Sequence, residues 1–263
     1  MKKEFFVDKL RVVITDTRDE MGAAAASDAA EYMRAQIAKL GGISAIFAAA
    51  PSQNEVLEHV SREDIDWSKV TAYHMDEYVG LAPDAPQRFA RYLDEHIFSK
   101  VNFGKVNYLA GDDGKLNPVY SDMFTHNRAD ICFMGIGENG HIAFNEPGSS
   151  LSSRTRIKTL TSETVKANSR FFDGDINQVP RTALTVGIGT IMDAEEVMIL
   201  AAGANKARAI HHAIEGSINH MWPVSILQMH QHALIVCDED AANELKADTV
   251  RYFKDIESAK IIK

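Results

Sequence analysis

A histidine and a glutamate lie close together after a glycine-rich turn in the stretch MGIGENGHIAFNEPG (134–148). His141 directly follows the last of three glycines, and Glu146 comes five residues later. Histidine is the side chain best suited to exchange protons near neutral pH. Together with Asn139, these two residues indicate a site for acid–base chemistry, with a packed loop around a buried histidine as the alternative.

The three glycines, Gly135, Gly137 and Gly140, also match the G-x-G-x-x-G spacing of a dinucleotide-binding turn. Such a turn needs a helix that opens at its last glycine, and Pro147 disfavours a helix through this stretch. Glu163 has roughly the spacing of a ribose-binding acid, but it lies in a basic stretch. The pattern therefore predicts a tight backbone turn that approaches a ligand closely.

A second candidate is the carboxylate pair Asp76 and Glu77 in HMDEYVG, directly after an apolar run. Adjacent side chains of a strand point in different directions. One carboxylate could therefore face a site as a general base while the other faces solvent or a partner. A surface pair that ends a strand is the alternative.

Two positively charged features could bind an anion. Lys206 in GANK precedes a predicted helix, where a cation is unfavourable for the helix dipole but could meet an anion bound at that end. An ordinary solvated lysine is the alternative. The segment 151–170 is strongly basic, and arginine binds phosphate in a bidentate manner. A solvated face and a flexible lid are its alternatives. The basic residues of this segment are Arg154, Arg156, Lys158, Lys166 and Arg170, against the single acid Glu163.

Strand-like apolar runs alternate with helix-like segments and must position these residues. The expected strands are 10–16, 43–50, 70–78, 130–137, 182–189, 195–203 and 233–239, and the expected helices are 19–42, 51–60, 89–98 and 205–216. Gly41 and Gly42 end the first helix, and Ser52 with Glu55 forms a capping box for the second. The pattern predicts one α/β domain over 1–263: a three-layer Rossmann-like sandwich with a mostly parallel sheet flanked by helices. In such sheets ligands bind at the carboxyl ends of the strands.

Composition narrows the class of protein. The chain has 263 residues, of which 45% are hydrophobic and 25% charged, enough for one large core. Neither a signal peptide nor a membrane-spanning run is expected, which predicts a cytoplasmic protein. Cys132 and Cys237 are expected to be reduced core residues, with no disulfide or metal role. The formal net charge of −9 disfavours nucleic-acid binding, so an anionic substrate would need a local basic pocket.

Several separated motifs, from about residue 66 to the C-terminus, resemble the glucosamine-6-phosphate deaminase (isomerase) family. They are HMDEYVGL, GIGENGHIAFNEPGSSLSSRTRIKTLT, ANSRFF, NQVPRTALTVGIGT, DAEEVMIL and GANKA. The related 6-phosphogluconolactonases share the glycine turn and the histidine but not the FNEP continuation. The resemblance implies conversion of glucosamine 6-phosphate and water to fructose 6-phosphate and ammonia, with neither a metal nor another cofactor.

The resemblance also implies roles for individual residues. Asp76 would move a proton between C2 and C1 after ring opening. His141 would open the pyranose ring by proton transfer to the ring oxygen. Glu146 would orient His141 and tune its charge, and Asn139, where many members have aspartate, would be a partner of the histidine. The phosphate would be held by Arg170 and Lys206, and an active-site lid would lie at about 151–185.

The main departure from the family lies at residues 47–55. Members usually have G-L-P-T-G-[GS]-T-P here as a phosphate loop, whereas this chain has FAAAPSQNE. Either Ser52, Gln53 and nearby N–H groups hold the phosphate, or the ligand differs. An epimer such as galactosamine 6-phosphate would keep the same chemistry. The sequence is also compatible with a sugar-lactone phosphate hydrolase or a non-catalytic sugar phosphate sensor.

Some members of the family are hexamers with an allosteric site for N-acetylglucosamine 6-phosphate. Five residues of this chain match positions used there: Ser149, Arg156, Lys158, Thr159 and Tyr252. That site also uses the N-terminus, which is several residues longer here. A homo-oligomer and this regulation are therefore both left open.

Overall fold

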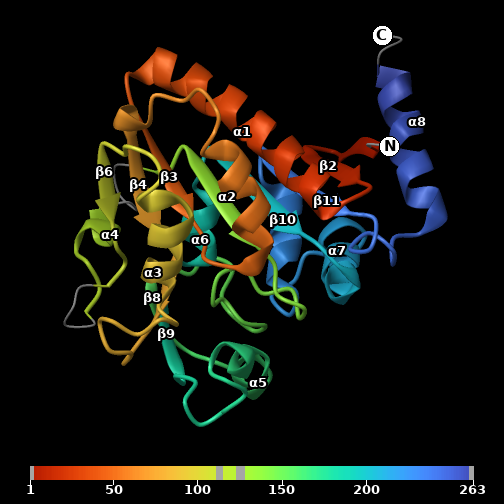
Figure 1. Ribbon diagram of the computed structural model, residues 1–263. Helices are drawn as coiled ribbons and strands as arrows, with labels where there is room; N and C mark the ends of the chain where they lie inside the picture. The colour runs from red at the N-terminus through yellow and green to blue at the C-terminus, as the bar shows by residue number, and fades with distance from the viewer. Residues whose placement is uncertain (1–2, 111–114, 123–127, 261–263) are drawn as a thin grey trace.

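An eight-stranded sheet forms the centre of the molecule, and a computed structural model describes it over residues 3–110, 115–122 and 128–260 (Figure 1). In spatial order the strands are β1 (Lys3–Val7), β2 (Leu10–Thr15), β11 (Ala233–Asp238), β10 (Glu196–Ala201), β7 (Ile131–Gly135), β3 (Ile43–Phe47), β4 (Val70–His74) and β6 (Lys105–Asn107). Only β1, which pairs with β2, is antiparallel. The mostly parallel sheet predicted from the sequence is confirmed.

Helices cover both faces of this sheet because both faces of each central strand are apolar. One face packs against α1 (Arg18–Leu40), α2 (Asn54–Val60), α3 (Phe89–Leu93) and the π-helical turn Asp94–Phe98. The other packs against α6 (Ile188–Met192), α7 (Ala207–Ile214), the 3-10 segment Pro223–Met229 and parts of α4 (Val119–Asp122) and α8 (Ala247–Lys260). Val12 and Val13 illustrate the alternation, since neighbouring residues of the strand enter opposite core clusters. The three-layer sandwich is thus confirmed.

A second sheet of three antiparallel strands corrects two of the predicted strands. Its order is β5 (Asp76–Tyr78), β9 (Thr182–Thr185) and β8 (Arg156–Thr159). The expected strand 70–78 breaks at Met75, whose carbonyl oxygen accepts a hydrogen bond from Val186 N (3.0 Å) instead of continuing the large sheet. The expected strand 182–189 is also short, because residues from Ile188 onward enter α6.

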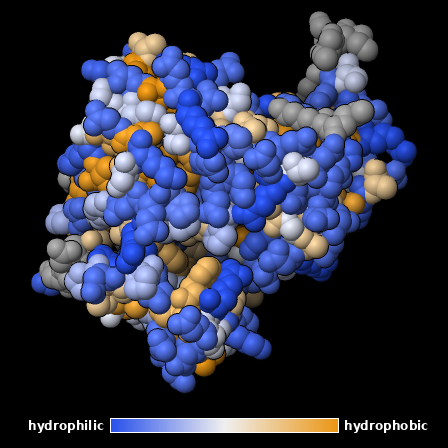
Figure 2. All heavy atoms as spheres, viewed as in Figure 1, coloured by the Kyte–Doolittle hydropathy of each residue, from blue (hydrophilic) through white to orange (hydrophobic). Residues whose placement is uncertain are grey.

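The second sheet and α5 (Ser162–Asn168) form a small lobe with its own apolar core. In Figure 1 this lobe lies below the large sheet, and Figure 2 shows the surface hollowed between the two parts. The Thr161 hydroxyl accepts a hydrogen bond from Thr164 N and so caps α5. The basic segment 151–170, which lacks helical periodicity in the sequence, therefore contains both a strand and a helix.

The ends of α1 follow the sequence signals. Thr17 caps its start by accepting a hydrogen bond from Glu20 N (3.2 Å), and Gly41 ends it in the left-handed conformation at φ 81°. No helix within the described part of the chain combines the length and the apolar character needed to cross a membrane.

Candidate active site

Four neighbouring strands carry the candidate residues at one edge of the large sheet. Strands β10, β7, β3 and β4 lie side by side and run parallel. Lys206 follows β10, the glycine turn follows β7, Ser52 and Gln53 follow β3, and Asp76 follows β4. The carboxyl ends of parallel strands meet at one edge, so the fold gathers four separated motifs there.

Asp76 lies where the chain leaves the large sheet for the small one. Its side chain is buried, and its Oδ1 atom has no hydrogen-bond partner among the described residues. Burial, with a smaller contribution from the charge of Glu77, raises the pKa of Asp76 to about 8. An unsatisfied, buried carboxyl group with a raised pKa is typical of an acid–base residue.

Glu77 has a different environment from its neighbour and does not face solvent as the sequence allowed. Its carboxylate accepts hydrogen bonds from the backbone N–H groups of Tyr78 (2.9 Å), Phe89 (3.1 Å) and Ala90 (3.0 Å). The Arg88 guanidinium lies 3.6 Å away. Glu77 therefore fixes the start of α3 against β5. Of the two carboxylates, Asp76 is the one available for acid–base chemistry.

Each glycine of the 135–140 turn avoids a specific clash. A Cβ atom at Gly135 would lie 2.6 Å from Ser52 Oγ, and one at Gly137 would lie 2.3–2.5 Å from the His141 ring. Gly140 adopts φ +79°, and a Cβ there would meet the Trp222 ring at 2.6 Å. The G-x-G-x-x-G spacing thus makes room for protein side chains, and no helix opens at Gly140.

The imidazole and the carboxylate of the turn face each other. His141 Nδ1 lies 3.6 Å from Glu146 Oε2, and the Glu146 side chain is buried. Burial acts to raise the pKa of Glu146, but the His141 interaction and further donors outweigh it and hold that pKa below its usual value. Asn139 donates to Glu146 Oε2 (3.0 Å) and accepts from His141 N (3.2 Å). It therefore fixes the backbone and the carboxylate rather than the imidazole.

The segment that carries His141 and Glu146 is joined to Asp76 through the end of β9. Thr185 Oγ1 accepts a hydrogen bond from Phe144 N (3.0 Å), and Asn145 Nδ2 donates to Val186 O (2.8 Å). Thr185 is also the register partner of Asp76 in the small sheet. A single strand end therefore holds the general-base candidate and the His141 turn in fixed positions.

The segment after β3 differs from its predicted form. The Ser52 side chain does not cap α2, which starts at Asn54 with no side-chain cap. A 3-10 turn over Pro51–Gln53 comes first, and it places Ser52 Oγ against Gly135. Glu55 pairs with Arg18 of α1 at 2.7 Å instead of closing a capping box. This ion pair compensates the negative charge of Glu55, which would otherwise repel an anion bound nearby.

Gln53 and Lys206 add polar groups at the same edge. Gln53 is fully buried, its Nε2 donates to Ser52 Oγ (3.3 Å), and its Oε1 has no partner among the described residues. Burial lowers the pKa of Lys206, Glu138 acts in the opposite direction, and Arg170 lowers it further. The positive charge of Arg170 therefore acts on Lys206.

Comparisons with known proteins show which family the chain belongs to. The family model described as glucosamine-6-phosphate isomerases/6-phosphogluconolactonase matches residues 16–236. The chain belongs to this family. The glucosamine-6-phosphate deaminase of Phocaeicola vulgatus is 51% identical over 203 residues, which cover 75% of this chain and 77% of that protein. The corresponding protein of Vibrio cholerae is 49% identical over 205 residues, covering 76% and 77%.

Solved structures show the same fold. A monomeric glucosamine-6-phosphate deaminase superimposes with a TM-score of 0.81 at 29% identity, covering 88% of this chain and 98% of that one. The 6-phosphogluconolactonase of Trypanosoma brucei has a TM-score of 0.73 at 15% identity, covering 89% and 98%, and shows likeness of fold alone.

The five residues that the sequence resemblance links to allosteric regulation do not converge within this chain. Ser149 is buried beside the turn, and Arg156 donates to Asn145 Oδ1 (2.9 Å). Lys158 and Thr159 lie on the same strand as Arg156. Tyr252 is exposed on α8, which packs on β1. The two groups are far apart in Figure 1.

Three residues that hold the candidate site together could not be assigned this role from the sequence alone. Thr185 and Asn145 connect β9 to the turn, and Trp222 packs on Gly140. Thr185 and Asn145 lie inside the recognised motifs, and their hydrogen bonds depend on how the two sheets meet. Only the three-dimensional arrangement reveals these contacts.

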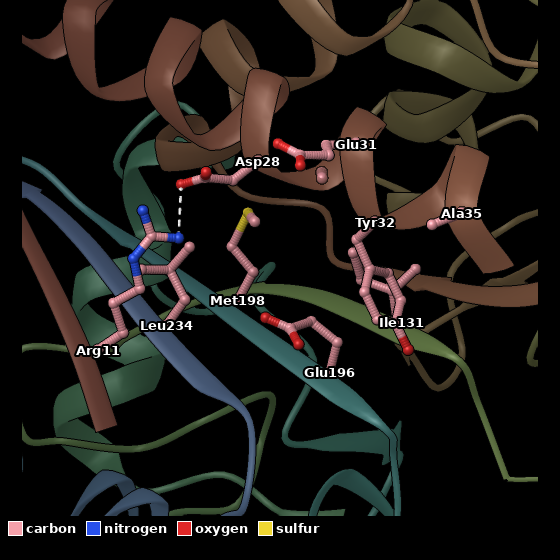
Figure 3. Close-up of a pocket in the computed structure, with 10 residues that line it drawn as sticks. Arg11, Asp28, Glu31, Tyr32, Ala35, Ile131, Glu196, Met198 and Leu234 are labelled. Carbon is pink, nitrogen blue, oxygen red and sulfur yellow. Dashed lines mark ion pairs between the residues drawn. The ribbon is translucent and has the colours of Figure 1, made fainter. Parts of the chain in front are cut away.

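A cavity of about 360 Å³ lies at the opposite edge of the sheet. Figure 3 shows it between α1 and the amino ends of the central strands, with Arg11 paired to Asp28 at 3.1 Å. Glu31 and Glu196 also line it, and burial, assisted by Asp28 and opposed by Arg11, raises the pKa of Glu196 to about 7. Its three carboxylates outnumber the single arginine, which disfavours binding of a phosphate. The cavity also lies at the amino ends of the strands and is therefore separate from the candidate active site.

Proposed function

We propose that this protein is a glucosamine-6-phosphate deaminase, which converts glucosamine 6-phosphate and water to fructose 6-phosphate and ammonia. The observation that carries the proposal is that β9 holds buried Asp76 and the His141–Glu146 turn together. An aldose–ketose shift needs one group at the ring oxygen and another at C2 and C1. These two groups supply those functions from separate chain segments.

The first chemical step is opening of the pyranose ring. His141 transfers a proton to the ring oxygen, and the Glu146 carboxylate, 3.6 Å from Nδ1, orients the imidazole. Asn139 keeps Glu146 in place. The open chain then exposes its aldehyde carbon C1 and the amine-bearing carbon C2.

The second step is proton transfer between carbons. Asp76 removes the proton from C2 while a proton passes from the C2 ammonium to the C1 oxygen, which gives an enolamine. Asp76 then returns its proton to C1, which leaves a protonated imine at C2. Water adds to this imine, the C–N bond breaks, and ammonia leaves with formation of the C2 ketone. Atoms balance as amino sugar phosphate plus water to ketose phosphate plus ammonia.

Binding energy comes from the remote phosphate, which orients the reacting carbons. We assign the phosphate to Arg170 and Lys206, with Ser52 and Gln53 completing its site in place of a glycine loop. The segment at about 151–185, which forms most of the small lobe, acts as the lid, because it carries Arg170 and its strand β9 pairs with β5, which begins with Asp76. The whole chain acts as one domain in the cytoplasm, where the buried thiols of Cys132 and Cys237 stay reduced.

The test is an ammonia-release assay over a panel of hexose 6-phosphates. Glucosamine 6-phosphate is expected to release ammonia with matching fructose 6-phosphate, and N-acetylglucosamine 6-phosphate, which has no free amine, serves as the blank. Turnover of galactosamine 6-phosphate alone would move the assignment to the epimer. Hydrolysis of 6-phosphogluconolactone without any ammonia would overturn the proposal, and binding without turnover would indicate a sensor.

A further inference from the structure

The turn that carries His141 is held from outside by one loop, residues 219–225. Trp222 of this loop covers Gly140, the residue directly before His141, so closely that a Cβ atom there would lie 2.6 Å from the indole Cε3. The left-handed backbone of Gly140 allows this contact. The indole therefore packs against the backbone that sets the direction of the imidazole.

Backbone hydrogen bonds from the same loop hold both ends of the turn. Val224 N donates to Gly140 O (3.0 Å), and Gly148 N donates to His220 O (2.8 Å). The segment 140–148, which contains His141 and Glu146, is thus fixed at its first and last residues. A displacement of the loop would move both members of the acid–base pair.

The loop is itself rigid. Asn219 Oδ1 accepts hydrogen bonds from Met221 N (2.9 Å) and Trp222 N (3.2 Å). The buried Ser225 hydroxyl accepts from Asn219 N (2.9 Å) and donates to Asn219 O (3.1 Å). These bonds close the loop on itself, so Trp222 is presented by a preformed support.

The indole also stacks on a second ring. The His212 ring stacks on Trp222 with centroids 3.8 Å apart and planes 16° from parallel. His212 lies in the last turn of α7, the helix that begins directly after Lys206. Trp222 is therefore held between α7 and the turn.

We propose that Trp222 is a positioning residue for His141, which fixes the imidazole for ring opening without touching the substrate. This role rests on the function proposed above. Misplacement of a catalytic group by about 1 Å can lower turnover on the order of 100-fold. Trp222→Ala is expected to lower kcat by about 10- to 100-fold with KM within about twofold. Trp222→Phe, which keeps a ring over Gly140, is expected to recover most of this loss.

Trp67→Phe is the matched control, because Trp67 is the other tryptophan of the chain. It is buried against Phe103 (5.0 Å) in the core cluster on the α1 face of the sheet. This control is expected to keep wild-type kcat. A loss of kcat in folded Trp67→Phe as large as that in Trp222→Ala would show a general effect of stability and overturn the proposal.

The second readout is the proton NMR signal of the His141 imidazole in the protein without substrate, identified by its absence in His141→Asn. Its chemical shift is expected to move in Trp222→Ala and in His212→Ala, which also tests the idea if the former does not fold. An unchanged signal in every folded variant would sink the proposal. If the wild type releases no ammonia, the proposed function fails, but this signal still decides whether Trp222 positions His141.

Discussion

At the scale of single residues, Asp76 poses the main chemical question. Its raised pKa means that the carboxyl group is largely protonated at neutral pH in the free protein. A base must be ionised, however. The amino group at C2 of the substrate supplies an answer: as an ammonium it would lie beside Asp76 and favour the carboxylate. The substrate would then help to activate its own base.

This argument predicts a pH dependence of the reaction. The free-enzyme profile, kcat/KM, should rise with pH through about 8, where Asp76 loses its proton. The acid limb of kcat should lie at lower pH, because the bound ammonium lowers the pKa in the complex. Initial rates between pH 5 and 10 check both limbs. An acid limb of kcat/KM near pH 4, the ordinary range of aspartate, would contradict the burial argument.

The Asp76 carboxyl group should lower the free energy of unfolding at high pH. Its pKa is higher in the folded than in the unfolded protein, so the stability it contributes is present below about pH 4 and is lost as pH rises through about 8. Asp76→Asn is expected to be nearly inactive yet more stable than wild type at pH 9, by about 1 kcal/mol or more. At pH 4 the two proteins should unfold alike. Urea unfolding at both pH values measures this, and equal stability at pH 9 would refute it.

At the scale of elements, two glycines of the 135–140 turn lie against different parts of the candidate site, the proposed phosphate site and the catalytic histidine. Gly135→Ala would push against Ser52 Oγ, whereas Gly137→Ala would push against the His141 ring. We expect the first change mainly to raise KM by about tenfold, and the second mainly to lower kcat by about 100-fold. Steady-state kinetics on glucosamine 6-phosphate distinguish them. A similar loss of kcat with unchanged KM in both would show that Ser52 does not contribute to phosphate binding.

Gly41→Ala provides the control for these two glycine variants. Gly41 ends α1 at φ 81° with open space around it and lies far from the turn in sequence. Alanine there should cost about 1 kcal/mol of stability from backbone strain alone. Its kcat and KM should stay at wild-type values.

The sequence predicted elements well where local signals decide them, and less well where tertiary contacts do. The helix over 18–40 has a capping threonine and a terminal glycine, and the central strands are continuous apolar runs, so both could be predicted. The break at Met75 could not, because it arises when Val186 of a distant strand bonds to the Met75 carbonyl. The capping box at Ser52 failed because Arg18 attracts Glu55 from another helix.

The candidate site was predictable as a set of residues but not as a geometry. Asp76, His141 and Glu146 follow apolar strands, and the rule for ligands in parallel sheets brings such positions together. The environment of Glu77, which accepts hydrogen bonds from two backbone N–H groups of α3, depends on a helix that starts twelve residues later. The contact between Trp222 and Gly140 joins segments about eighty residues apart. Neither segment has a sequence pattern that would predict this contact.

At the scale of the whole molecule, stability and chemistry occupy different regions. The candidate site uses the carboxyl ends of the central strands, whereas α8 packs on the edge strand β1, close to both ends of the chain in Figure 1. Phe253 of α8 stacks on the buried Phe5 ring with centroids 6.1 Å apart and planes 16° from parallel. The helix also accepts a hydrogen bond at Glu257 from Phe6 N. This contact covers one edge of the sheet.

Loss of this contact should therefore lower stability and leave catalysis intact. Phe253→Ala is expected to reduce the free energy of unfolding by about 2 kcal/mol, less than a fully buried phenylalanine would cost because Phe253 is only half-buried. Its neighbour Lys254 is exposed, so Lys254→Ala is the control and should change stability by less than about 0.5 kcal/mol. Urea unfolding measures both variants, and steady-state kinetics below the unfolding transition should return wild-type kcat and KM. A loss of kcat in folded Phe253→Ala would show that α8 influences the active site from the far edge of the sheet.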